Sequence, residues 1–496
     1  MDTQALKDKI LQLAIQGKLV SQNENDEPAS VLLERIKEEK EQLVKDKIIR
    51  KEKAFPDITD DEKTFNIPNG WEWCRLCDIG IYKKGPFGST ITKSMFVPKS
   101  ENTIKVYEQK NAIQKDWKLG DYYVTKEYFE EKLKGFEVFE GDIIVSCAGT
   151  IGETYIMPSG IERGIINQAL MRIKLFNGIN IEYFLIYFDF ILKETSKESS
   201  KGSAIKNIPP FDIFKKMLLP LPPLEEQKRI VAKVDSLFKL IDELDRNKQD
   251  LLQNISDTRN KVLQLAIEGK LVTQDENDEP ASALLERIKN EKEQLIKNKV
   301  IKKEKLLPEI TNEEKLFEVP NGWGWCRLGE ISFKITDGSH NPPKGEENYT
   351  EYIMLSSQNI NNNGLVNLEK SRFLSKHNYE IENKRTNVNK GDILLTIVGT
   401  IGRSCIYTNE LKITLQRSVG VIDTKYCNKY VKYLLDSTYA QNYFKTNSSG
   451  TAQKGIYLNQ LKLTTLPLPP LEEQKRIVAK VDAIMNYLDM LEKEIK

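Results

Sequence analysis

The sequence LPLPPLEEQKRIVAKVD occupies residues 219–235 and returns without a change at residues 466–482. After each Pro-Pro pair, apolar residues recur at alternating spacings of three and four, which is the pattern of an amphipathic helix. In the first copy this pattern continues as far as Gly269 and predicts a helix of about 45 residues, about 67 Å long. Its apolar positions are Ile230, Val234, Leu237, Ile241, Leu244, Leu251, Ile255, Val262 and Leu265. Such a narrow stripe is typical of a coiled-coil seam, so the helix needs a partner helix.

The partner helices are predicted at the two ends of the chain. The C-terminal stretch repeats the seam at Ile477, Val481, Ile484, Leu488, Leu491 and Ile495. The N-terminal stretch, with Ile10 and Leu13 on the seam, corresponds to the second half of the central helix. The first and last helices together therefore reproduce the central helix, cut near its middle. We expect an antiparallel two-helix coiled coil that holds two domains apart, in a circular, pseudo-two-fold chain whose termini meet.

A second repeat extends this helical frame. Residues 11–53 and 263–305 differ at nine of 43 positions, and PNGWEWCRL at residue 68 matches PNGWGWCRL at residue 320. Each long copy predicts a further helix that is entered through Asp-Glu-Pro-Ala-Ser, with Pro near the first turn. The end of this segment, KDKIIRKEK at residues 45–53, is rich in Lys and Arg. It is most simply a solvated face, and contact with DNA phosphates or a partner subunit is the alternative.

The segments between the repeats have diverged and read as mixed α/β, with short β-type runs bounded by Gly-rich turns. The predicted fold class is α+β. We divide the chain into an N-terminal helical scaffold segment (1–68), a first variable domain (69–219), a central helical spacer and scaffold (220–319), a second variable domain (320–466) and a C-terminal spacer helix (467–496). Uniform drift after a duplication would not leave identical islands beside unrelated sequence. The pattern therefore indicates two different surfaces on one repeated frame.

Composition excludes several classes of protein. Of the 496 residues, 39% are hydrophobic and 30% charged, which is typical of a soluble globular protein and not of a disordered one. The longest apolar stretch, residues 183–192, is interrupted by Asp189 and is too short to span a bilayer. The N-terminus has no apolar signal core, so we expect a cytoplasmic protein with no membrane contact. Because the net charge is +1, nucleic-acid binding must come from local patches.

Metal and catalytic motifs are incomplete. Cys74 and Cys77 have the spacing of half a zinc knuckle, but no second pair completes four ligands. The stretch Asn-Pro-Pro at residue 341 begins like an adenine methyltransferase motif but lacks the aromatic residue that would stack on a flipped base. The two Gly-Thr-Ile-Gly segments at residues 149 and 399 have no P-loop Lys, so we interpret them as tight turns between strands. We therefore expect no intrinsic catalysis and no metal site.

Polar loops of the variable domains are the better indication of function. Gln and Asn amides pair with the adenine edge, Arg and Lys pair with guanine, and Ser or Thr contact either bases or phosphates. In the first domain the candidate residues are Lys84, Phe87, Ser89, Tyr107, Gln109, Lys110, Asn111, Gln168 and Lys201. In the second domain they are Thr336, Asp337, Ser339, His340, Ser357, Gln358, Asn359, Gln416, Arg417 and Lys454. A single loop of this kind is ordinary turn chemistry, but two domains that each carry several of them favour the reading of DNA bases.

These motifs, in this order, resemble those of the specificity subunits of type I restriction-modification enzymes over essentially the whole chain. The resemblance rests on LQLAIQGKLV, NDEPAS, TDGSH, the GDI and GTIG segments, and PLPPLEEQKRIVAKVD before a seamed helix. It implies two target-recognition domains, each of which reads one half of a bipartite site on double-stranded DNA. It also implies a helical ruler for the gap and a frame that docks two modification (methyltransferase) subunits. The TDGSH loop occurs only in the second domain, since the first has GPFGS there, so a base contact shared by the two loops is not expected.

The same resemblance places the cofactors elsewhere in the complex. S-adenosylmethionine is expected on the modification subunits, and ATP and Mg are expected on the restriction subunits that translocate and cleave DNA, so none is expected on this chain. Two rival functions remain: a self-contained methyltransferase and a coiled-coil scaffold without sequence-specific DNA binding. The bases that are read do not follow from loop composition.

Overall fold

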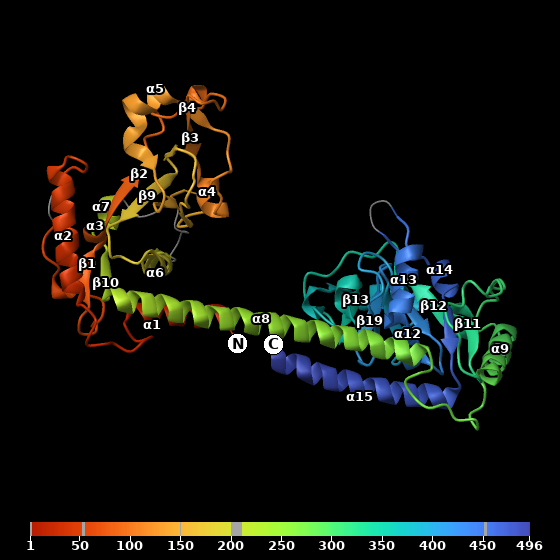
Figure 1. The fold of residues 1–496 in the computed structure, drawn as a ribbon. Helices are drawn as coiled ribbons and strands as arrows, with labels where there is room; N and C mark the ends of the chain where they lie inside the picture. Colours follow the sequence, from red (N-terminus) through yellow and green to blue (C-terminus); the bar gives the residue numbers. More distant parts are fainter. Residues whose placement is uncertain (1, 52–54, 149, 200–210, 451–453) are drawn as a thin grey trace. The chain divides into compact units, whose positions relative to one another are not determined.

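The computed structural model describes residues 2–51, 55–148, 150–199, 211–450 and 454–496, and it contains both helices and sheets, as the α+β prediction requires (Figure 1). Its contacts divide the chain into two compact units, Met1–Arg246 and Asn247–Lys496. Each unit combines one part of the helical frame with one variable domain. No helix in the described part of the chain is both long and apolar enough to cross a membrane.

The predicted central helix is confirmed as α8, Leu224–Ile267, with 44 residues. It starts directly after Pro223 and ends two residues before Gly269, whose φ of +69° stops a helix. The buried positions of its stripe are Ile230, Val234, Ile241, Ile255 and Val262. Leu244 and Leu251 were predicted on the seam, but they are 50% and 47% exposed, so the seam is open at these two positions.

Both partner helices run antiparallel to α8, as predicted. In the first unit α1 (Thr3–Ile15) lies along the first half of α8, with Lys7 Nζ 2.6 Å from the carboxylate of Asp242. In the second unit α15 (Leu471–Ile495) lies along the second half of α8, with Arg259 Nη2 2.5 Å from the carboxylate of Asp489. These two ion pairs stand at equivalent positions of the repeat. That the two termini meet stays a prediction.

The second predicted frame helix is confirmed in both copies, as α2 (Ala29–Lys45) and α9 (Ala281–Lys297). Leu32 and Ile36 of α2 are buried, and so are their counterparts in α9. The basic run at residues 45–53 was predicted to end this helix, but the helix stops at Lys45 and the run continues beyond it.

The identical islands of sequence join each variable domain to the frame. In the first unit β1 (Glu72–Arg75) pairs with β10 (Leu218–Leu221), and in the second unit β11 (Gly324–Arg327) pairs with β21 (Thr465–Leu468). A buried carboxylate at the start of the following helix accepts a hydrogen bond from the adjacent indole. Trp71 Nε1 donates to Glu226 at 3.0 Å, and Trp323 Nε1 donates to Glu473 at 2.9 Å. Burial raises the pKa of Glu226, so this carboxylate depends on its hydrogen bonds.

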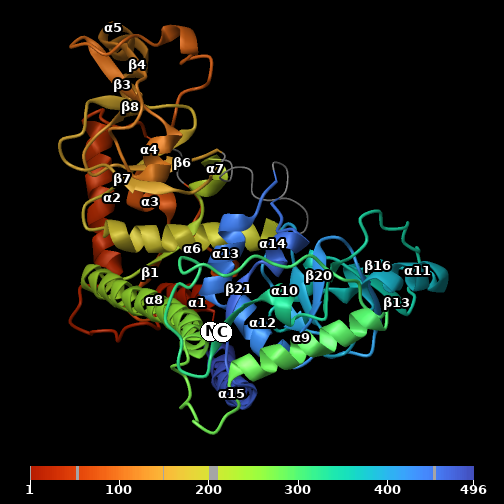
Figure 2. The ribbon, with the colours of Figure 1, turned by 90° about the vertical axis from the view of Figure 1, so that its right-hand side faces the viewer.

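The first variable domain consists of two sheets and one long helix. The first sheet has the antiparallel order β2 (Gly80–Lys84), β9 (Leu170–Leu175), β6 (Ile143–Ser146), β7 (Thr154–Ile156). The second sheet has the order β4 (Tyr123–Thr125), β3 (Thr103–Tyr107), β8 (Gly164–Ile166), β5 (Glu137–Val138), and β3 and β8 are parallel. Helix α6 (Ile181–Ser199) lies beneath the first sheet and above α8 (Figure 2). The hydroxyl of Tyr183 donates to the carbonyl of Pro220 at 2.7 Å and so ties α6 to β10.

The second variable domain repeats the strand order of the first sheet despite its different sequence, whereas its second sheet has three strands and not four. One sheet runs β12 (Lys334–Asp337), β20 (Val419–Asp423), β17 (Ile393–Thr396), β18 (Ser404–Ile406), and the other runs β16 (Arg372–Phe373), β13 (Tyr352–Leu355), β19 (Lys412–Leu415). The strands β13 and β19 are parallel, like β3 and β8.

The other α-helices and strands of the two units are short. They are α3 (Leu76–Ile79), α4 (Gln109–Gln114), α5 (Lys126–Tyr128), α7 (Phe211–Phe214), α10 (Leu328–Ile331), α11 (Lys376–Thr386), α12 (Asn428–Asp436), α13 (Thr438–Asn447), α14 (Leu458–Lys462), β14 (Ile360–Asn361) and β15 (Gly364–Leu365).

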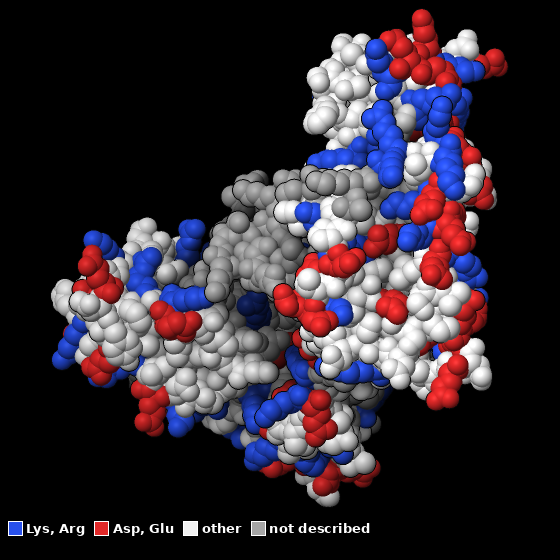
Figure 3. Space-filling view, turned by 90° about the vertical axis from the view of Figure 1, so that its left-hand side faces the viewer, with Lys and Arg blue, Asp and Glu red and all other residues white. Residues whose placement is uncertain are grey.

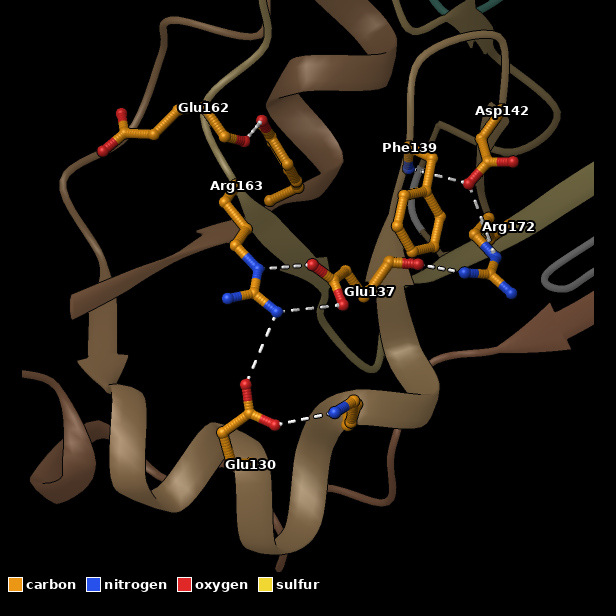
Figure 4. Close-up of polar contacts among 9 residues, drawn as sticks. Glu130, Glu137, Phe139, Asp142, Glu162, Arg163 and Arg172 are labelled. Atoms are coloured by element: carbon orange, nitrogen blue, oxygen red, sulfur yellow. Dashed lines mark hydrogen bonds and ion pairs between the residues drawn. The ribbon is translucent and has the colours of Figure 1, made fainter. Parts of the chain in front are cut away.

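Two arginines hold β5 of the first domain, and one of them, Arg172, connects its two sheets (Figure 4). Arg172 on β9 donates to the carbonyl oxygen of Glu137 on β5, and its Nε lies 3.7 Å from the carboxylate of Asp142. Arg163 Nε donates to the Glu137 carboxylate at 2.5 Å and its Nη2 lies 3.5 Å from Glu130. Because Glu137 is held from both sides, β5 fixes the position of the first sheet against the second.

Candidate nucleic-acid interface

Four strand ends of the first domain come together at one edge. Because β3 and β8 are parallel neighbours, their carboxyl ends lie side by side, and Asn167 N donates to the carbonyl of Tyr107 at 3.1 Å. The end of β2 joins them, since Gly85 N donates to Leu170 O at 2.9 Å, and the end of β6 joins through Cys147 N and Ala169 O at 2.8 Å. We call residues 84–89, 107–111, 147–148, 150–152 and 167–169 the first loop cluster.

The second domain builds the same edge from unlike residues. Gln416 N donates to Leu355 O at 2.8 Å, Gly338 N to Val419 O at 3.1 Å and Ile397 N to Ser418 O at 2.9 Å. These bonds are the counterparts of the three in the first domain. We call residues 336–340, 355–359, 397–402, 416–418 and 454–455 the second loop cluster.

One glycine in each cluster allows two loops to touch. A Cβ on Gly85 would lie 1.8 Å from the carbonyl oxygen of Asn167, and a Cβ on Gly338 would lie 2.0 Å from that of Leu415. Any larger residue at these positions must push a backbone segment away. Two backbone segments are therefore in direct contact at this edge in both domains.

We expect Gly85→Ala and Gly338→Ala each to lower the free energy of unfolding by about 2–3 kcal/mol, because the new methyl group overlaps backbone. Chemical denaturation of the purified chain measures this. Gly88→Ala is the matched control from the same loop, since a Cβ there meets nothing within 4 Å and should change stability by less than about 0.5 kcal/mol. Equal stability of Gly85→Ala and Gly88→Ala would contradict the close approach.

The second Gly-Thr-Ile-Gly segment and residues 150–152 of the first lie in turns between strands, as predicted, whereas Gly149 lies outside the described residues. The first links β6 to β7, with Glu153 N donating to the Ser146 hydroxyl at 3.1 Å, and the second links β17 to β18, with Arg403 N donating to Thr396 Oγ1 at 3.0 Å. In both turns the hydroxyl also donates to the carbonyl of the Thr of the turn, Thr150 or Thr400. A side-chain oxygen therefore occupies the centre of each turn.

Many of the predicted DNA-contacting residues do lie on the clusters with their side chains accessible. The exposed ones are Lys84, Phe87, Ser89, Lys110 and Gln168 in the first domain and His340, Gln358, Arg417 and Lys454 in the second. Gln109, Thr336, Ser357 and Gln416 are half-buried. Phe87 is 87% exposed, which is unusual for an aromatic ring and leaves it free to contact a ligand. Lys201 lies outside the described residues.

Five predicted contact residues are buried, and we correct their assignment. Tyr107 is fully buried, and its hydroxyl donates to the carbonyl of Glu162. Asp337, the last residue of β12, and Ser339, two residues later, are also buried. The other two, Asn111 and Asn359, share one local structure described next. Burial removes all five from direct contact with DNA and gives them a role in shaping the loops.

Asn111 and Asn359 hold the two strand-end loops in the same way. The Asn111 amide oxygen accepts from Glu108 N at 2.7 Å, and the Asn359 amide oxygen accepts from Ser356 N at 2.9 Å. Asn111 Nδ2 donates to backbone carbonyls five and eight residues further on, and Asn359 Nδ2 donates to carbonyls seven and eight residues further on. Each amide thus replaces missing backbone partners in its loop. A polar residue three positions before an Asn at the end of a strand was the sequence signal for this cap.

Asp337 is the centre of an ion-pair cluster that the sequence analysis missed in part. Its carboxylate pairs with the guanidinium of Arg385 and with His340 Nε2, the latter at 2.7 Å. Arg385 Nε also donates to the Asp337 carbonyl at 2.8 Å. Arg385 is 48 residues away in the chain, so no local pattern could have identified it. The cluster orients His340, whose ring stays more than half exposed.

Two cations next to the first loop cluster were also missed. Lys83 on β2 stands directly opposite Arg172 on β9, so both side chains point to the same side of the sheet. Burial, and then Arg172, lower the pKa of Lys83. Like charges at opposite positions are unfavourable unless an anion lies nearby, and the Asp142 carboxylate, 3.7 Å from Arg172 Nε, is such an anion. Thr336 and Val421 fill the corresponding pair of the second domain, which therefore lacks these charges.

The surface around these cations is mixed in charge. Figure 3 shows one face of the molecule, on which Lys and Arg side chains alternate with Asp and Glu side chains in the upper lobe. The positive charge is therefore local, as a net charge of +1 requires.

The described residues include no group of three or more His, Cys, Asp or Glu side chains placed to hold a metal ion. All six cysteines are free and buried. Burial raises the pKa of Cys74 well above its usual range, so this thiol stays protonated. The pair Cys74 and Cys77 is thus part of the core beside β1 and α3.

Comparison with known proteins gives consistent results. The family model described as "Type I restriction modification DNA specificity domain" matches residues 68–254 and 320–496. The EcoAI specificity subunit of Escherichia coli is 31% identical over 99% of this chain and 90% of its own length, and the EcoEI subunit of the same species is 29% identical with the same coverage. The HsdS subunit from Thermoanaerobacter tengcongensis has a TM-score of 0.51 at 18% identity and covers 87% of this chain and 93% of that one. A chain from a study of complex assembly in a type I restriction-modification system has a TM-score of 0.52. These two structures support the fold.

Proposed function

The chain belongs to the family of type I restriction-modification specificity subunits, and from that premise we propose that it reads a bipartite, asymmetric DNA site with its two loop clusters. The observation that carries this proposal is the repeated edge of four strand ends. The same backbone hydrogen bonds build it in both domains, while the exposed side chains differ. A rigid common frame with unlike side chains supports two readers of two different half-sites.

The chemistry of the exposed side chains suits double-stranded DNA. Lys84, Lys110 and Lys454 can neutralise phosphates, and Gln168, Gln358 and Arg417 can pair with base edges in the major groove. Neither cluster contains an exposed carboxylate among the candidate residues. This chain then contributes recognition and no catalysis.

The frame supports the docking of two modification subunits. Apolar side chains stay exposed in both copies: Leu240 on α8 corresponds to Tyr487 on α15, and Leu244 and Met490 lie about one turn further along their helices. Repeated binding surfaces recruit repeated partners. S-adenosylmethionine belongs to those partners in this proposal, and ATP and Mg belong to the restriction subunits that the complex directs. This chain binds none of them itself.

The first test is a map of N6-methyladenine in the host genome, with and without this gene. We expect an interrupted, asymmetric motif that disappears when the gene is deleted. Binding of S-adenosylmethionine to the isolated chain would instead favour a self-contained methyltransferase. No gene-dependent motif, together with no half-site preference of the complex reconstituted with its modification subunits, would leave only a scaffold.

A further inference from the structure

The turn between the last two strands of the first cluster has a close counterpart in the second. In the first domain β8 turns into β9 through Asn167-Gln168-Ala169, and Leu170 N donates to Asn167 O at 3.1 Å. In the second domain β19 turns into β20 through Gln416-Arg417-Ser418, and Val419 N donates to Gln416 O at 3.0 Å. The same turn closes in both domains, and Gln168 and Arg417 occupy the same position in it.

The backbone under both positions is held on several sides. The first residue of each turn donates its N–H to the end of the parallel strand, to Tyr107 O or Leu355 O. The third residue of each turn accepts from the strand beside it, from Cys147 N or Ile397 N. The close approach of Gly85 or Gly338 adds a further contact. A side chain at this position is therefore presented on fixed backbone, which base reading requires.

The two side chains are available for a ligand. Both are exposed, and neither makes a hydrogen bond or an ion pair with another residue that the structure describes. Their neighbours are already engaged, since the Asn167 amide oxygen accepts from Ala169 N at 3.0 Å and Ser418 Oγ accepts from Ser357 N at 3.1 Å. The Gln168 amide and the Arg417 guanidinium are thus available to a ligand at the same position of two turns, whereas a neighbouring side chain in each turn already forms a hydrogen bond.

We propose that this position selects one base pair in each half-site, with Gln168 reading an adenine and Arg417 reading a guanine. The inference rests on the proposed function and adds to it the residues and the bases. A Gln amide matches the N6 and N7 atoms of adenine, and an Arg guanidinium matches the O6 and N7 atoms of guanine, in each case through two hydrogen bonds. The two half-sites then differ at the base pair below this turn because the two side chains differ.

The experiment exchanges the two side chains one at a time within the full chain, co-expressed with its partner subunits. In Gln168→Arg, one base pair of the first half-site should change from A·T to G·C while the second half-site stays the same. In Arg417→Gln, the reverse change should occur in the second half-site alone. The N6-methyladenine map of each strain gives both half-sites at once. Ser159→Ala and Asn409→Ala, exposed residues at the opposite ends of these strands, should leave the motif intact.

A second pair of variants keeps the test decisive if an exchange abolishes methylation. Gln168→Ala and Arg417→Ala should each lower discrimination at one base pair by about 10-fold to 100-fold in competition binding with duplexes that differ at single positions. A gene-dependent motif that no variant alters would overturn this inference and leave the proposed function in place. Loss of preference at several base pairs at once would also overturn it. Absence of any gene-dependent motif in the unmodified strain would count against the proposed function itself.

Discussion

The double substitution Leu240→Glu, Leu244→Glu should leave the chain folded and remove one of the two modification subunits that we propose dock on the frame. Both side chains are about half exposed, 53% and 50%, so the isolated chain loses little packing. If a modification subunit covers this surface, it would bury the two introduced Glu carboxylates without a counter-ion. The affinity for that subunit should then fall by more than about 100-fold. The mass of the purified complex measures the number of bound subunits.

The repeat supplies a matched test for this surface. Tyr487→Glu with Met490→Glu alters the other copy of the frame, where the side chains are 57% and 59% exposed. It should remove the other subunit, and the four substitutions together should remove both. A complex that keeps two modification subunits with all four substitutions would show that they dock elsewhere. Thermal unfolding of each variant alone separates lost docking from lost folding.

The second large effect concerns the distance between the half-sites. Removal of residues 247–253 from α8 and residues 490–496 from α15 shortens the helix pair by one heptad, about 10 Å. At about 3.4 Å for each base pair, the spacer of the methylated motif should shrink by about three base pairs, and both half-sites should stay the same. The motif from a genome-wide methylation map reports the spacer directly.

The control for this deletion keeps the length and changes the side chains. Replacement of residues 247–253 by a heptad of Ala, Glu and Lys should leave the spacer as it was. The ruler interpretation would be wrong if the deletion altered a half-site, or if the complex still methylated its original motif with the original spacer. Co-purification with the modification subunits verifies that the shortened frame assembles.

The frame could be predicted from the sequence because its signals are local. The Pro-Pro pair, the three-and-four spacing and Gly269 are all read along one helix, and they placed α8 within two residues. Leu244 and Leu251 fit the same spacing but stay half exposed. Periodicity identifies the apolar stripe of a helix, whereas the length of stripe that is covered depends on where the partner helices begin and end.

The loop clusters could be predicted only as loops. Polarity marked them correctly, yet Tyr107, Asn111 and Asn359 face inward, where their side chains replace backbone partners. A polar residue at a strand end serves the turn or a ligand, and composition cannot separate the two. The cations Lys83 and Arg172 were missed for a different reason, since strand pairing sets them opposite each other across 89 residues of chain.

The β1–β10 strand pair and the Trp71–Glu226 hydrogen bond, which together we call the clamp, have a consequence for how such proteins change their specificity. Each variable domain enters and leaves its frame through one short strand pair, and the second unit has the same pair and the same clamp. The segment between Glu72 and Leu221 is therefore a cassette. Exchange of this segment with the segment between Gly324 and Leu468 should preserve the strand pair and the Trp–Glu hydrogen bond of each unit. A new specificity then needs no redesign of the frame, only the transplantation of one such cassette.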